Sequence, residues 1–185
     1  MASKYRVIKD TREKDGWFFS KYDKCEGMDV STLHTGDYTL KGYEDVICIE
    51  RKASVSEIAM NLGKKKAAFY REMERIKDYD FKYMLLEFSA SDVINYPQSL
   101  LSDSDKVIYQ RAKSGEIALP DFKRFQVVEQ TKISGKYLLK SLLEISIRYE
   151  INVMFCDNKE NAFIVCNSIF KRLNELFDGK KDGNQ

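Results

Sequence analysis

Residues 35–52 read TGDYTLKGYEDVICIERK, and the rest of the fold can be built outward from them. Two runs rich in β-forming residues flank a turn around Gly42 and Asp45, which predicts an antiparallel hairpin. The second run, residues 46–49, is apolar at every position, as is typical of a central strand that helices cover on both faces. The sequence therefore predicts a buried strand that ends in three charged residues.

Strand and helix patterns alternate on both sides of this hairpin. A short β-type run at 5–9 precedes it, and apolar residues recur near a 3.6 period over 55–76, which predicts one long helix with a kink near Gly63. The remaining predicted elements, in chain order, are a buried strand at 81–88, a helix at 137–149, a buried strand at 151–156 and a closing helix at 160–177.

This order predicts an α/β fold of three layers, in which helices flank a central mixed β-sheet. We expect one domain over residues 1–178, because 185 residues suffice for one ordinary core but not for two. Residues 99–132 show no sustained period, so we expect an insertion there with one short helix. We expect residues 179–185 to form a flexible C-terminal tail.

Composition excludes several classes of protein. Thirty-one Lys and Arg face 29 Asp and Glu, so the net charge of +2 does not by itself indicate a polyanionic partner. The four cysteines include no C-x-x-C pair and predict reduced, buried thiols rather than a zinc knuckle or a disulfide framework. No run approaches the roughly 18 apolar residues of a membrane span, and the N-terminus is too charged for a signal peptide. We expect a soluble, cytoplasmic protein without a membrane partner.

The residues that point to chemistry are Asp37, Glu50 and Lys52. Side chains on a strand share a face at every second position, so Glu50 and Lys52 lie about 7 Å apart on one face. The hairpin brings Asp37 beside them. Two carboxylates are hard oxygen ligands suited to Mg²⁺, and a lysine next to them can orient or deprotonate a water or stabilise charge on phosphorus. This pattern indicates metal-assisted phosphodiester hydrolysis, whereas charged residues at a strand end are usually only solvated.

Three separated motifs carry a resemblance to a known family. They are VIKDTRE at residues 7–13, TGDY at residues 35–38, and IERK at residues 49–52, which a helix pattern follows. Together they resemble the nuclease domain of the XPF family of structure-specific endonucleases, a branch of the PD-(D/E)xK fold. The resemblance covers about residues 5–98, and more loosely residues 135–177. It implies a restriction-endonuclease-like fold.

The resemblance also implies roles for the acidic residues. Asp37 and Glu50 would be the principal ligands of Mg²⁺, for which Mn²⁺ is expected to substitute. Asp10 and Glu13 would be further metal ligands, directly or through water.

The basic residues of these motifs have implied roles too. Lys52 would act on the attacking water. Arg12 and Arg51 would contact the scissile phosphate or brace the carboxylates, although Arg51, which faces the other way along the strand, could instead form an outward salt bridge. The catalytic residues implied by the resemblance are Asp10, Arg12, Asp37, Glu50, Arg51, Lys52 and Glu57.

Two departures from the family pattern matter. The last aspartate of the family motif falls on Ser56, and Glu57 follows one residue later, so we align Glu57 to that acid. Glu57 also stands three residues after Ser54, which predicts a capping box, and both interpretations stay open. The second departure concerns the tandem helix-hairpin-helix module that grips duplex DNA in the family. No sequence after residue 177 could supply it, so DNA affinity is expected from the domain itself or from a partner.

Basic and aromatic residues interleave in the middle of the predicted long helix. Such a patch can follow phosphates along DNA, and the alternative is an ordinary solvated helix face, because acidic residues dilute it. The candidate DNA-binding residues are Lys64, Lys65, Lys66, Arg71 and Arg75.

The sequence thus predicts a divalent-metal-dependent DNA endonuclease that is structure-specific or nicking and acts on duplex or branched DNA. The compact form resembles stand-alone nucleases of bacteriophage or archaeal type. The alternatives are a restriction-type or junction-resolving endonuclease on the same core, and a catalytically silent DNA-binding subunit. Family members pair through equivalent helices, so a homodimer or a partner subunit is expected.

Overall fold

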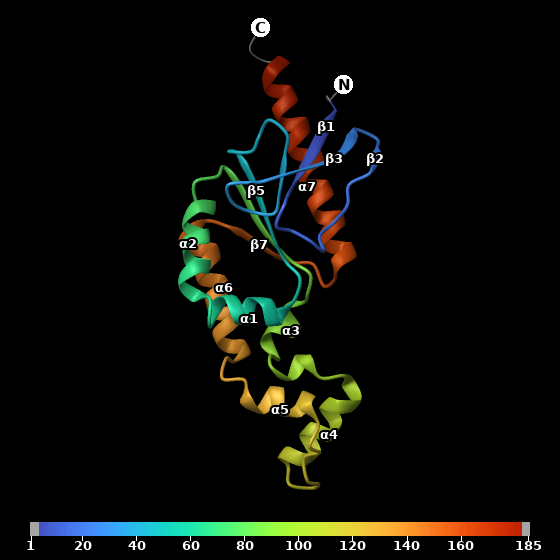
Figure 1. Cartoon of the computed structure of the whole chain (residues 1–185), viewed down its shortest axis with the longest axis vertical. Coiled ribbons are helices and arrows are strands. Elements are labelled where there is room, and N and C mark those ends of the chain that lie inside the picture. Colours follow the sequence, from blue (N-terminus) through green and yellow to red (C-terminus); the bar gives the residue numbers. More distant parts are fainter. Residues whose placement is uncertain (1–3, 183–185) are drawn as a thin grey trace.

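Seven strands form one mixed sheet in the computed structural model, which describes residues 4–182. The strands are β1 (Tyr5–Asp10), β2 (Lys21–Tyr22), β3 (Cys25–Ser31), β4 (Tyr38–Leu40), β5 (Ile47–Lys52), β6 (Phe81–Leu86) and β7 (Asn152–Phe155). Their order is β2-β3-β1-β4-β5-β6-β7 (Figure 1). The predicted hairpin is confirmed as the antiparallel pair β4 and β5, and β5, β6 and β7 run parallel to one another.

No sequence pattern predicts β3, which lies parallel to β1. Its residues CEGMDVS mix acidic and apolar side chains, and its C-terminal end is exposed, so no run of apolar residues marks it. Gly27 interrupts it with a φ of +102°, which favours glycine, and the β1 register shifts at the neighbouring residues. A half-exposed strand near the sheet edge leaves little signal in the sequence.

Helices cover both faces of the sheet, which confirms the three-layer α/β prediction (Figure 1). The helices α1 (Val55–Leu62), α2 (Lys66–Ile76) and α6 (Gly135–Tyr149) pack on the face that includes Cys48. The helix α7 (Lys159–Asp182) packs on the opposite face. Each layer of helices encloses its own apolar core, so the central strands are buried on both sides.

The prediction of one helix over 55–76 is wrong about its continuity but right about the irregularity near Gly63, where the chain divides it into α1 and α2. Gly63 ends α1 with φ −101° and ψ −103°, outside the helical region. A Cβ at this position would collide with the carbonyl of Ala59 and the side chain of Ile133. The turn therefore needs glycine, and it lets α2 fold back across the sheet.

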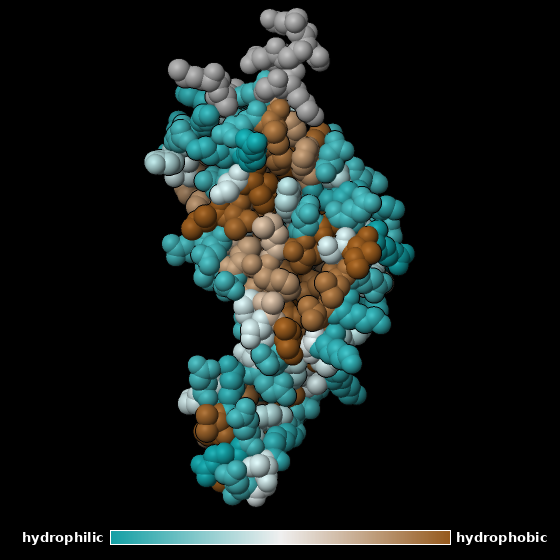
Figure 2. Space-filling view, turned by 180° about the vertical axis from the view of Figure 1, so that it is seen from behind, coloured by the Kyte–Doolittle hydropathy of each residue, from teal (hydrophilic) through white to brown (hydrophobic). Residues whose placement is uncertain are grey.

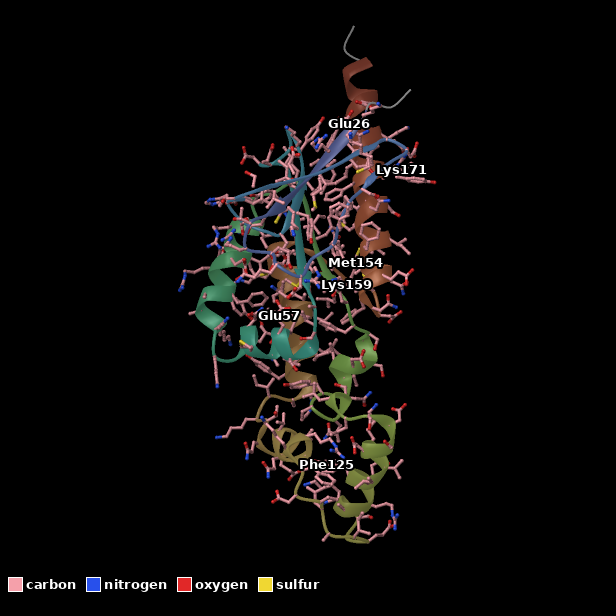
Figure 3. The ribbon with its side chains drawn as sticks, turned by 45° about the vertical axis from the view of Figure 1, so that its right-hand side comes forward. Glu26, Glu57, Phe125, Met154, Lys159 and Lys171 are labelled. Atoms are coloured by element: carbon pink, nitrogen blue, oxygen red, sulfur yellow. The ribbon has the colours of Figure 1, made fainter. Side chains whose placement is uncertain are left out.

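Residues 98–130 form a small helical lobe below the sheet (Figure 1). After α3 (Ala90–Ile94), it contains η1 (Gln98–Leu100), α4 (Asp103–Lys113) and α5 (Lys123–Gln130), so the expectation of one short helix was wrong. Phe125 is completely buried in the lobe and stacks on Tyr109 (Figure 3). The lobe has its own minor core, formed by Leu101, Tyr109, Phe125 and Val128.

The C-terminal helix is longer than predicted. The helix α7 continues through residues 179–182, which were expected to belong to a flexible tail, while residues 183–185 lie outside the described residues. All four cysteines are unpaired and buried, as predicted. Within residues 4–182, we find no helix that combines the length and the hydropathy of a membrane span.

Candidate active site

Asp37, Glu50 and Lys52 come together where β5 ends. Glu50 and Lys52 alternate with Arg51 along β5, and they face α1 and α2. The backbone N–H of Asp37 donates to the carbonyl of Ile49 at 2.8 Å, and its Oδ2 accepts from the N–H of Arg51 at 2.7 Å. These bonds fix Asp37 beside β5, as the hairpin prediction required.

The glycine before Asp37 makes this approach possible. Gly36 has a φ of +77°, and a Cβ there would overlap the Sγ of Cys48 on β5. Only glycine combines that backbone conformation with so close a contact. Gly36 therefore sets the distance between Asp37 and the strand that carries Glu50.

The three charges perturb one another. Lys52 donates to Oε1 of Glu50 and lies 3.4 Å from Oε1 of Glu57. Burial disfavours the charged lysine, but Glu50, Glu57 and Asp37 outweigh it and raise the pKa of Lys52 above its ordinary range. Burial and then the charge of Glu50 raise the pKa of Asp37 well above the usual aspartate value. The surrounding carboxylates thus favour the charged form of Lys52, and Asp37 is a carboxyl that gains from a nearby positive charge.

One oxygen of this cluster has no partner. Glu50 is only 3% exposed, and its Oε2 accepts no hydrogen bond. A buried, unpaired carboxylate oxygen is costly, so the site is suited to a cation that would contact Oε2. In the part of the chain that the structure describes, no three Asp, Glu, His or Cys side chains are grouped closely enough to hold a metal ion on their own. Asp37 and Glu50 could supply two ligands, and water and a phosphate oxygen the others, which suits Mg²⁺.

Asp10, predicted as a further metal ligand, is already saturated. Its Oδ1 accepts from the backbone N–H and Nε of Arg12, and its Oδ2 accepts from Nη2 of Arg12 and from the N–H of Leu33. Burial opposes ionisation, but these bonds lower the pKa of Asp10 overall. Four accepted bonds fill the capacity of a carboxylate, so Asp10 has no free oxygen for an ion. It holds the loop after β1 and braces Arg12.

Arg51 and Glu13 belong to the opposite face of the sheet. The Arg51 guanidinium donates to both oxygens of Glu87 at 2.7 Å and to Glu13 at 3.2 Å. Trp17 donates its indole N–H to Glu87 at 2.7 Å, and the guanidinium lies 5.8 Å from the centre of that ring. The structure therefore braces Arg51 and Glu13 in a salt-bridge network, and brings neither side chain to Oε2 of Glu50.

Glu57 bears on both interpretations that the sequence left open. Its backbone N–H donates to the Oγ of Ser54, the N-cap residue, at 3.2 Å. Its Oε2 accepts from the N–H of Ala53 at 2.9 Å and not from the N–H of Ser54, so the helix start is capped but the reciprocal bond of a capping box is missing. Its Oε1 also pairs with Lys52. Figure 3 shows Glu57 where α1 begins at the end of the sheet. The carboxylate of Glu57 thus both stabilises the start of α1 and offsets the positive charge of Lys52.

The predicted basic patch lies on the turn after α1 and along α2. All five of its side chains, which are Lys64, Lys65, Lys66, Arg71 and Arg75, are exposed. Lys66 is also held against α6, because it donates to Tyr137 at 3.3 Å and lies over that ring and the ring of Tyr70. We call the other four, together with the 65% exposed Arg12, the cationic border. Two of its members, Arg75 and Arg12, lie close enough to Glu72 to oppose the rise of its pKa.

Sequence reasoning missed Glu72 and Glu87. Glu87 follows β6 and accepts from Arg51, and nothing in its sequence context marks it. Glu72 on α2 is partly buried, and burial followed by the charge of Glu50 raises its pKa to about 7. It stands three residues after Phe69 and next to Met73, both buried, so the helical period could have placed it on the inner face.

Fold and site together define a class of protein. A mixed sheet covered by helices on both faces, with carboxylates and a lysine at the end of a central strand, is the arrangement of a restriction-endonuclease-like nuclease domain. A family model described as the ERCC4 domain matches residues 9–168. This chain belongs to the ERCC4 domain family, which confirms the resemblance that the three motifs carry.

Solved structures support the same fold. The structure of XPF from Aeropyrum pernix matches with a TM-score of 0.55 and 15% identity over 96% of this chain and 69% of that chain. The same archaeal protein in complex with DNA matches with a TM-score of 0.54 and 17% identity over 93% of this chain and 66% of that chain. No curated protein matches the sequence.

Proposed function

We propose that this chain is a divalent-metal-dependent DNA endonuclease that hydrolyses phosphodiester bonds, in a structure-specific or nicking manner. One observation carries the proposal: Glu50, buried beside Asp37 and Lys52, keeps an oxygen without a partner. A buried charge that only maintains the fold would be fully paired.

The residues of the candidate active site would have different roles in such a hydrolysis. A bound Mg²⁺ supplies a Lewis acid, which acidifies water and offsets the negative charge of the phosphate. Asp37 and Glu50 would hold that ion. Lys52, buried among Glu50, Glu57 and Asp37, would act on the attacking water, by orienting or deprotonating it, or would stabilise charge on phosphorus. Glu57 keeps the ammonium group in place.

The cationic border gives DNA a path to the site. Exposed Lys64, Lys65 and Arg71 can neutralise phosphates, as can Arg12 next to the carboxylates. The related archaeal structure described as a complex with DNA supports DNA as the ligand. We do not assign Lys66 to phosphate binding, because its ammonium group donates a hydrogen bond to Tyr137 and lies over the ring of Tyr70.

The catalytic proposal is tested with supercoiled plasmid and with labelled flap, fork and junction DNA, in Mg²⁺, Mn²⁺ or EDTA. We expect cleavage with either ion and none with EDTA. Asp37→Asn keeps an oxygen that can accept from the N–H of Arg51 but removes the negative charge, so it should bind DNA without cutting it. DNA binding by the wild type without cleavage would select the catalytically silent subunit. Preferential cutting of four-way junctions or of one duplex sequence would select the junction-resolving or restriction-type alternative.

The DNA path is tested by a double charge reversal, Lys64→Glu with Lys65→Glu. We expect weaker DNA binding, with the slope of log affinity against log salt reduced by about 2. The matched control is Lys4→Glu with Lys21→Glu, which changes the same charge at the β2 end of the sheet and should leave the slope unchanged. Equal slopes in the two variants would exclude this border as the DNA path.

An apolar surface indicates where a partner subunit would bind. The strand β7 is a free edge of the sheet, and the helices on either side of it expose large apolar side chains. Figure 2 shows this apolar band across the middle of the molecule, seen from behind. Its exposed members are Leu143, Ile147, Met154, Ile164 and Leu176. We expect a second copy of the chain to cover it.

Light scattering over a range of protein concentrations tests this pairing. We expect a dimer that Ile147→Glu converts to a monomer, because Ile147 is 80% exposed and its change should not disturb the fold of one chain. Phe18→Glu, at a 73% exposed position outside this band, is the control. A wild type that stays monomeric at all concentrations would contradict the homodimer.

A further inference from the structure

Glu72 on α2 faces the same space as Glu50, from the helix that covers the site. The ring of Phe69, one turn earlier on α2, lies 5.6 Å from the Nζ of Lys52. Residues three apart share a helix face, so Glu72 lies on the surface of α2 that covers Glu50 and Lys52. Met73 and Ile76, both fully buried, fix the rotation of the helix.

The electrostatics agree with this position. After burial, the charge of Glu50 is the main cause that raises the pKa of Glu72. Burial also raises the pKa of the Cys48 thiol, and Glu50, Asp37 and Glu72 add to that effect in this order. Cys48 precedes Glu50 on the same face of β5, so three carboxylates surround one region of the strand.

Among residues 4–182, Glu72 makes no hydrogen bond or salt bridge, although Lys52, Arg75 and Arg12 act on it from a greater distance. The neighbouring Glu74, which is exposed, has a cationic partner in Arg148 at 3.9 Å. Partly burying one carboxylate close to another is unfavourable, and Lys52 is already engaged with Glu50 and Glu57. The unpartnered Oε2 of Glu50 gives an independent sign that a positive ligand is missing from this region.

We infer that Glu72 is a positioning residue of the cation site: its carboxylate accepts a hydrogen bond from water on a divalent ion that the free Oε2 of Glu50 and Asp37 hold. This inference rests on the proposed function, and it adds a residue to the site that the family motifs do not contain. Contact through water agrees with the absence of three directly grouped ligands among the described residues. Mg²⁺ and Mn²⁺ commonly keep several waters, which need acceptors around them.

The test measures ion binding without DNA, by titration calorimetry with Mn²⁺ at pH 8. We expect Glu72→Gln to lower the Mn²⁺ affinity by about 10- to 100-fold, the usual effect of removing a carboxylate that supports a metal site. Glu74→Gln, two residues away on the exposed face, should bind Mn²⁺ like the wild type. Glu72→Asp keeps the charge and should recover part of the affinity.

Thermal unfolding in EDTA separates ion binding from a role in folding. Because burial and the charge of Glu50 outweigh the attraction of Lys52, Arg75 and Arg12 for the Glu72 carboxylate, Glu72→Gln should not lower the melting temperature of the ion-free protein. A variant that loses both Mn²⁺ affinity and stability in EDTA would make Glu72 structural and overturn the inference. Wild-type affinity in Glu72→Gln would overturn it and leave the proposed function intact. A wild type that takes up no Mn²⁺ would overturn both.

Discussion

The two faces of β5 carry charged clusters of opposite character. On one face, Arg51 bonds to both oxygens of Glu87 and to Glu13, and Trp17 donates to the same glutamate. On the other face, Glu50 keeps an unpartnered oxygen beside Asp37 and Lys52. The residues alternate along one strand, and both clusters are buried, so burial alone does not distinguish them.

The difference lies in how completely the charges are paired. A buried ion pair stabilises a fold only when hydrogen bonds satisfy its atoms, and the Arg51 face meets that condition. On the Glu50 face, several carboxylates surround the single ammonium group of Lys52, so part of the negative charge has no positive partner. The complete network indicates a structural role, and the incomplete one indicates a site for a positive ligand.

Breaking the complete network should have the largest effect on stability. Arg51→Met leaves the partly buried Glu87 and Glu13 without their buried cation, and we expect a loss of about 3–5 kcal/mol in the free energy of unfolding. Urea denaturation of the purified protein measures it. The control is Arg172→Met, which removes an exposed pair with Glu175 and should cost at most about 1 kcal/mol. Equal losses in the two variants would refute the structural role of the Arg51 network.

The neighbouring residue should show the reverse behaviour. Glu50→Gln removes the charge of the unpartnered oxygen while its amide oxygen can still accept from Lys52. We expect cleavage to fall by about 10²–10³-fold, as when one electrostatic group is removed from an active site. The free energy of unfolding should fall by less than about 1 kcal/mol. If Glu50→Gln unfolds the protein instead, the contrast between the two faces does not hold.

Part of this contrast follows from the sequence alone. The alternation of Glu50, Arg51 and Lys52 on a predicted strand already separates the two faces, because strand periodicity is two. The hairpin then places Asp37, since its turn and its two β-rich runs are local features. Local patterns therefore suffice for the three residues at the centre of the site.

The rest depends on contacts that the sequence pattern does not contain. Asp10 is saturated only because the chain returns to place the N–H of Leu33 against it. Glu87 is paired only because β6 lies beside β5. In the sequence, Glu72 resembles a solvated charge, and only the turn at Gly63, which folds α2 back across the sheet, places it near the site. The helices α4 and α5 show no clear helical period in the sequence, because only a few residues of each reach the core of the lobe.

The incomplete cluster should also change stability with pH. The pKa of Glu72 is about 7 in the folded chain against an ordinary value of 4.5, so ionisation destabilises the fold as pH rises through this range. Without metal, we expect Glu72→Gln to match the wild type at pH 4 to 5 and to exceed it by about 1–2 kcal/mol at pH 8, after allowing for partial exposure. Denaturation at the two pH values in EDTA measures the difference. An equal difference at both pH values would mean that Glu72 does not titrate in the folded chain as described.

The smallest effect is expected at Glu57, which belongs to both kinds of interaction. Ser54→Ala removes the side chain that caps α1 but leaves the pair between Glu57 and Lys52, so it should cost about 1 kcal/mol of stability and leave cleavage nearly unchanged. Glu57→Gln keeps an oxygen for the N–H of Ala53 but removes the charge beside Lys52, so it should cost less stability and reduce cleavage several-fold. Denaturation and cleavage assays on both variants separate the two roles. Loss of cleavage in Ser54→Ala equal to that in Glu57→Gln would show that Glu57 acts in cleavage only by starting α1.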